Sequence, residues 1–160
     1  MANIQLLLRQ HVGAPCAPVV KVGDEVKKGT LVAEPTGLGA NIFSSVYGKV
    51  VEITEDRIII EPAAEQPAEY VKIAKSENKL DMIKAAGVVG LGGAGFPTAV
   101  KLGTDLKGGY ILVNAAECEP GLRHNMVQLE DEEYCAKTVR GALYCMEVAK
   151  AGKVIFAVKK

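Results

Sequence analysis

The chain has 160 residues, with 19 basic and 19 acidic side chains, no net charge at pH 7, and only 5% aromatic residues. This length fits one domain or a small pair, and neither the balanced charge nor the scarce aromatics suit a nucleic-acid surface. The longest apolar run, residues 88–100, is broken by glycines and is too short to cross a bilayer, and no leader sequence is visible. We therefore expect a cytoplasmic protein with no nucleic-acid partner and no direct membrane insertion, peripheral at most to a membrane complex.

Histidine and cysteine give no metal signal. The four cysteines, Cys16, Cys118, Cys135 and Cys145, have spacings that match neither zinc nor iron–sulfur ligand patterns. They are expected to be reduced and mostly buried, and His11 is expected to be a structural residue.

The first half of the chain alternates short apolar segments with turns. Strand-like residues at 4–8 precede a segment, 19–34, with turns at Gly23-Asp24 and Lys28-Gly29, where hairpins are expected. A second such unit covers residues 42–53, and Glu55-Asp56 turns it into strand 57–61. Short strands at this spacing predict a small β-sandwich or barrel.

A stretch rich in Pro, Ala and Glu follows at residues 61–69 and has the composition of an exposed connector. We place the domain boundary here, with one domain at 1–65 and a second at 66–160. In the second domain, Ser76 is expected to cap a helix over 77–86, and the glycine-rich stretch 87–98 follows it.

The rest of the second domain has a strand–helix–strand pattern. We predict a buried strand at 110–115, a loop at 116–121, a helix over 129–150 and a strand at 153–158, which together form a βαβ unit with a parallel pair. Two strands make too small a sheet, because parallel sheets are covered on both faces. We therefore expect residues 66–160 to be the front part of a longer α/β domain. The uncovered sheet could support self-association.

The glycine-rich stretch is the strongest chemical signal. Glycine lets backbone N–H groups approach a ligand, and Pro97 suits the start of a helix whose N-terminus favours anions, with Lys101 one turn inside. A phosphate cradle and a plain glycine-rich connector both remain open. The segment also fits G-x-G-x-x-G with Glu117 about twenty residues later. A helix rather than a strand precedes it, which disfavours an ordinary dinucleotide site.

Two resemblances follow from longer motifs. The Val-Gly-Asp-x-Val-x-x-Gly string from Val22 and the later Gly48-Lys49-Val50 resemble the barrel-sandwich hybrid of lipoyl and biotinyl carrier domains, but the interval 35–45 has no lysine to modify. The strings 90–98 and 114–121 resemble the FMN- and NADH-binding subunit of complex I and, more closely, the RnfC family of electron-transport subunits. Residues 8–15 match RnfC alone. Arg123-His124-Asn125 is similar to RnfC-like proteins associated with clostridial proline reductase.

The RnfC resemblance implies a barrel-sandwich hybrid followed by an incomplete α/β domain that binds FMN and NADH for hydride transfer. It implies contacts to the flavin phosphate and ribityl chain from the glycine loop, and nucleotide packing from Phe96. Asn114 and Glu117 would meet the flavin, Cys118 would lie beside it, and Glu119 would meet the nucleotide. The implied cofactor-binding set is Gly90, Gly92, Gly93, Ala94, Gly95, Phe96, Lys101, Asn114, Glu117, Cys118 and Glu119.

The resemblance also sets limits. Leu91 and Ala116 stand where the complex I pattern has Arg and Asp, although Ala is usual in RnfC. The [4Fe–4S] clusters of full-length relatives would lie beyond Lys160, so we expect this chain alone to bind flavin weakly or not at all and to be inactive. Its partners would be other subunits of an electron-transfer or reductase complex. The alternatives are a non-catalytic docking module and, against the missing lysine, a carrier domain.

Overall fold

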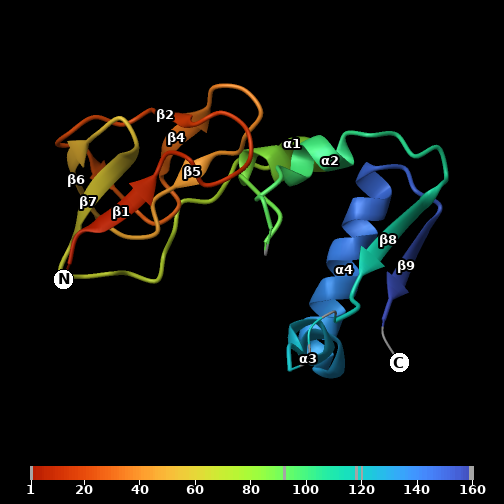
Figure 1. The fold of residues 1–160 in the computed structure, drawn as a ribbon. Coiled ribbons are helices and arrows are strands. Elements are labelled where there is room, and N and C mark those ends of the chain that lie inside the picture. The colour runs from red at the N-terminus through yellow and green to blue at the C-terminus, as the bar shows by residue number, and fades with distance from the viewer. Residues whose placement is uncertain (1, 92, 118, 120, 159–160) are drawn as a thin grey trace. The chain divides into compact units, whose positions relative to one another are not determined.

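The computed structural model describes residues 2–91, 93–117, 119 and 121–158. The chain divides into two compact units, residues 1–101 and 102–160, whose elements are labelled in Figure 1. Each unit is described by itself. Within the described residues, no helix combines the length and the apolar composition that crossing a membrane requires.

The first unit begins with a β module made of two antiparallel sheets (Figure 1). One sheet has the order β1-β7-β6-β3, and the other has the order β2-β4-β5. The strands are β1 (Ile4–Leu7), β2 (Cys16–Pro18), β3 (Glu25–Val26), β4 (Leu31–Pro35), β5 (Ile42–Phe43), β6 (Gly48–Ile53) and β7 (Arg57–Pro62).

Both sheets contribute side chains to one core. Val50, Ile58 and Ile60 from the first sheet and Val32 and Ala33 from the second are completely buried and belong to the same cluster. In β7 every second residue is buried, as expected when one face of a strand packs on a core. Burying a side chain of this size contributes about 1.5–3 kcal/mol. The sandwich predicted for the first half is therefore confirmed.

Strand pairing in the module differs from the local hairpins expected at 19–34. The turn at Glu55-Asp56 does join two paired strands, β6 and β7. In contrast, β2 pairs with β4 and β3 pairs with β6, so these sequence neighbours do not pair with each other. The turns at Gly23 and Gly29 instead move the chain between the two sheets.

The predicted connector lies along the β module. The Gln66 side chain accepts a hydrogen bond from the Tyr47 N–H (2.9 Å) and donates one to the Tyr47 carbonyl (2.7 Å). Further on, the Val71 N–H donates to the Lys28 carbonyl at 2.8 Å. Residues 66–71 are thus anchored to the module, and the boundary at 65/66 stays a prediction.

The first unit ends with two short helices, α1 (Lys79–Ala85) and α2 (Thr98–Leu102). The predicted cap of α1 was wrong by two residues: Asn78, not Ser76, accepts the bond from the Leu80 N–H (2.9 Å). The Ser76 hydroxyl accepts a bond from the Asn78 N–H instead. The glycine-rich stretch joins the two helices.

The second unit contains the predicted parallel pair. Strand β8 (Tyr110–Asn114) pairs in parallel with β9 (Lys153–Ala157), and α4 (Glu132–Val148) packs against β9 (Figure 1). The single helix predicted over 129–150 was wrong in one respect. A separate helix, α3 (His124–Glu130), precedes α4, because Asp131 leaves the helical conformation and caps α4 through the Tyr134 N–H.

Candidate functional site

The glycine-rich stretch forms an irregular hairpin within the first unit. Val89 and Pro97 form an antiparallel bridge at its base. The Gly90 N–H donates to the Phe96 carbonyl at 3.0 Å, and the Thr98 N–H donates to the Val88 carbonyl at 2.9 Å. These bonds leave the hairpin tip outside the bridge.

The tip is exposed to solvent. Leu91 is 95% exposed, and a Cβ added at Gly93 would meet no atom within 4 Å. From Gly93 to Phe96, no backbone N–H donates a hydrogen bond to any other described residue. Exposed peptide N–H groups that lack a protein acceptor can bind an anion.

An aromatic ring and a cation stand next to these amides. Phe96 is 38% exposed, and the Lys101 ammonium lies 5.9 Å from the centre of its ring. This distance is within the range of a cation–π contact. The structure therefore brings together the described predicted residues of the first unit: Gly90, Gly93, Ala94, Gly95, Phe96 and Lys101.

The second predicted cluster lies in the second unit, at the carboxyl end of β8. The Asn114 side chain accepts a hydrogen bond from the Ala116 N–H at 3.2 Å and stabilises the turn after the strand. Glu119 is exposed, and its carbonyl accepts a bond from the Leu122 N–H. Two further predicted residues, Gly92 in the glycine loop and Cys118 in this loop, lie outside the described residues.

Glu117 has a structural role that the sequence did not reveal. Its Oε1 accepts hydrogen bonds from the N–H groups of Asn125 (2.6 Å) and Met126 (3.3 Å), and its Oε2 lies 3.4 Å from the His124 Nδ1. The side chain is only 11% exposed. A carboxylate at the first turn of a helix satisfies free N–H groups and favours the helix dipole. Glu117 thus holds the start of α3.

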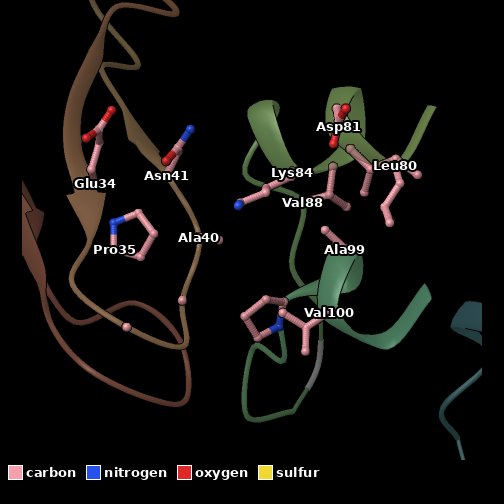
Figure 2. Close-up of a pocket in the computed structure, with 14 residues that line it drawn as sticks. Glu34, Pro35, Ala40, Asn41, Leu80, Asp81, Lys84, Val88, Ala99 and Val100 are labelled. Carbon is pink, nitrogen blue, oxygen red and sulfur yellow. The ribbon is translucent and has the colours of Figure 1, made fainter. Parts of the chain in front are cut away.

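Sequence reasoning also missed a cavity in the first unit (Figure 2). It has a volume of about 680 Å³ and lies between the segment after β4 and helices α1 and α2. Its charged side chains, Glu34, Asp81 and Lys84, have mixed signs, so they indicate no ligand class. None of the described predicted site residues lines it. No cluster of three metal-ligating side chains occurs among the residues described by the structure.

Comparison with known families matches both parts of the chain. The model of the RnfC barrel sandwich hybrid domain matches residues 1–76, and that of the Nuo51 FMN-binding domain matches residues 83–160. The chain belongs to the RnfC family. The fold class expected from the sequence, a barrel-sandwich hybrid followed by an α/β FMN-binding domain, is confirmed.

Curated RnfC relatives align over most of the chain. The RnfC-type subunit of the proton-translocating ferredoxin:NAD(+) oxidoreductase complex of Clostridium ljungdahlii is 37% identical over 95% of this chain and 37% of its own length. The corresponding subunit of the Na(+)-translocating ferredoxin:NAD(+) oxidoreductase complex of Acetobacterium woodii is 37% identical over 77% of the chain and 32% of its own length. That of the ion-translocating oxidoreductase complex of Vibrio cholerae is 30% identical over 98% and 22%. The chain thus spans between about a fifth and two fifths of these relatives.

Proposed function

We propose that the chain binds FMN at the glycine-rich hairpin and serves in an RnfC electron-transfer subunit that takes electrons from NADH. The clusters that receive these electrons, of the [4Fe–4S] type, are proposed to lie outside residues 1–160. One observation carries the proposal: the amides of residues 93–96 are exposed and donate to no other described residue, in a segment that belongs to an FMN-binding domain match.

The residues of the hairpin fit the phosphate end of a flavin nucleotide. The open space around Gly93 admits close approach of a phosphate to the backbone. The Lys101 ammonium supplies a positive charge beside the same amides, and the exposed ring of Phe96 offers an apolar surface for a flat ligand. Leu91 carries no charge, so Lys101 is the cation on which the proposed phosphate contact depends.

The residues after β8 are proposed to meet the flavin ring and the nucleotide. Asn114 and Glu117 stand at the carboxyl end of a parallel strand, where ligands of α/β sheets commonly bind. Because Glu117 holds α3, we propose that it also fixes the position of the loop that carries Glu119. Cys118 keeps its predicted place beside the flavin.

FMN, when bound, supplies the chemistry of accepting a hydride from NADH and releasing electrons singly. The chain supplies position and electrostatics. The hairpin amides and Lys101 hold the phosphate, and Phe96 restricts water on one side of the ligand. None of these groups needs to gain or lose a proton for that role.

The proposed partners are other subunits of a reductase complex, with ferredoxin as the electron-exchange partner at the level of the whole complex. The support is that the relatives are named as subunits of ferredoxin:NAD(+) oxidoreductase complexes. A link to proline reductase stays a prediction. In the structure Arg123 pairs with Glu130, and His124 lies beside Glu117, so both residues of that motif contact groups around α3.

Flavin titration followed by NMR tests the proposal even if binding is weak. We expect amide shifts at residues 90–96 and 101 with FMN, and smaller shifts at the same concentration of riboflavin, which lacks the phosphate. Lys101→Ala should weaken FMN binding about tenfold, equivalent to about 1.4 kcal/mol.

Lys49→Ala provides the matched control, because Lys49 is an exposed lysine of the β module outside the hairpin. This variant should bind FMN like the unmodified chain. Equal shifts with FMN and riboflavin, or no shifts in the hairpin at millimolar FMN, would remove the phosphate cradle and leave the docking-module alternative.

A further inference from the structure

The segment around His11 lies against the glycine-rich hairpin. The Val12 N–H donates to the Ala94 carbonyl at 2.8 Å. Gly95 has a φ of +66°, and a Cβ placed there would lie 3.1 Å from the His11 Cα and 3.1 Å from the Gln10 carbonyl oxygen. The tip of the hairpin is therefore attached to the N-terminal segment by one hydrogen bond and by close backbone contact.

The same segment is fixed on its other side by the chain between β4 and β5. The Ala14 N–H donates to the Leu38 carbonyl at 3.1 Å. A Cβ added at Gly39 would lie 2.5 Å from the His11 Cε1, so the imidazole is packed directly against this backbone. This interval is where carrier domains hold their modified lysine. Here it forms a wall behind His11.

His11 connects these two sides through its ring nitrogens. The side chain is buried, with 7% exposure, and its Nε2 accepts a hydrogen bond from the Ala40 N–H at 3.1 Å. A neutral imidazole with Nε2 as acceptor carries its proton on Nδ1, which can then donate to the Val12 carbonyl at 3.1 Å. Burial raises the pKa of the Cys16 thiol, which stays protonated and donates to the Ala40 carbonyl at 3.3 Å.

We propose that His11 is a positioning residue for the glycine-rich hairpin. Its Nε2 is held by Ala40, its Nδ1–H orients the peptide of Val12, and the N–H of Val12 fixes the carbonyl of Ala94. The unbonded amides of residues 93–96 are thereby held in one arrangement before a ligand arrives. A ligand then loses less conformational entropy on binding. The consequence for flavin affinity rests on the proposed function, but the order of the hairpin does not.

A purely structural role for His11 would give a different result. A histidine that only fills space in the β module would affect the module as a whole when replaced. The proposed role instead predicts a local effect, carried by Nδ1, on the hairpin. Amide hydrogen exchange can separate the two, because the Val12 and Gly90 N–H groups report the hairpin, and the Val50 N–H, bonded to the Asp24 carbonyl at 2.9 Å, reports the module.

The first experiment measures amide exchange in the flavin-free chain. His11→Leu fills the ring's space without hydrogen bonds and should speed exchange at Val12 and Gly90 about tenfold or more, with Val50 changed less than twofold. His11→Asn places a donor near the position of Nδ1 and should restore most of the protection. His11→Gln, which reaches the position of Nε2, should not. Equal exchange in all variants, or equal acceleration at Val50, would overturn the proposal.

The second experiment needs no variant, so it stays decisive if the substituted chains fail to fold. Long-range proton–nitrogen NMR of the unmodified chain should show His11 protonated at Nδ1 and unprotonated at Nε2. The opposite tautomer would overturn the proposal. If the unmodified chain binds FMN, His11→Leu should weaken binding and His11→Asn should not. If it does not bind FMN, the proposed function fails, while exchange and tautomer still decide the role of His11.

Discussion

The β module and the second unit use their apolar residues differently. In the module, alternating residues of two sheets face one another, and Val50, Ile58 and Ile60 are fully buried. In β8 the same alternation leaves Tyr110 65% and Leu112 70% exposed, because α4 packs on one side of the parallel pair only. A period of two thus specifies a strand in both units, but it does not specify what covers the strand's second face.

The largest effect should come from the module's core. Ile58→Ala removes a completely buried side chain from between two sheets, and we expect a loss of about 2–5 kcal/mol in the free energy of unfolding. The matched change in the second unit, Leu112→Ala, should alter stability by less than about 0.5 kcal/mol, because this side chain already contacts water. Urea unfolding followed by amide signals of each unit measures both values. Similar losses would contradict the comparison.

A smaller effect is expected where the second unit depends on helix capping. The Asp131 side chain accepts a hydrogen bond from the Tyr134 N–H at 2.9 Å and separates α3 from α4. Asp131→Ala should lower the stability of this unit by about 1 kcal/mol.

Asp131→Asn keeps an acceptor and should retain most of that stability, which gives a matched control. Helix content from circular dichroism and the urea midpoint of the second unit are the measurements. An Asn variant as unstable as the Ala variant would mean that the charge, rather than the cap, is what Asp131 contributes.

Much of the local structure was predictable because its signals are local. Strand alternation, the turn at Glu55-Asp56 and the apolar runs around β8 and β9 gave the strands and the parallel pair. The break between α3 and α4 was missed because apolar residues continue in helical phase across it. Asp131 followed by Glu132 and Glu133 is a helix-start pattern that could have revealed it.

The long-range features were not predictable from one sequence. The pairing of β2 with β4 and of β3 with β6 is set by the shared core, not by the turns between neighbours. The glycine motif predicted an exposed loop beside Phe96 and Lys101, and motif likeness supplied its proposed ligand. Nothing near His11 in sequence signals its contact with Ala40, 29 residues away. The boundary at 65/66 and the roles of the site residues remain predictions.

The smallest expected effect concerns a surface ion pair of the second unit. The Lys150 ammonium lies 2.8 Å from the Asp105 carboxylate, where the segment before β8 meets the end of α4. The hydrogen bond from Lys150 and a further one from the Lys107 N–H lower the pKa of Asp105, and Asp105 in turn raises the pKa of Lys150. Both groups are solvent-exposed, so screening keeps the contribution small.

The sign of its pH dependence follows from these directions. A carboxyl pKa lowered by folding stabilises the folded state fully above its unfolded value, about 3.9, and this contribution is lost as pH falls through the lower folded value. A raised lysine pKa stabilises fully below about 10.4, and this is lost as pH rises through the folded value. Asp105→Asn should therefore destabilise the second unit by a constant amount between about pH 5 and 9, and by less below about pH 4. Thermal melts across this range, repeated with added salt, measure the difference; an undiminished effect at about pH 3 would mean that the side chain acts through its shape and not its charge, because a protonated Asp105 cannot attract Lys150.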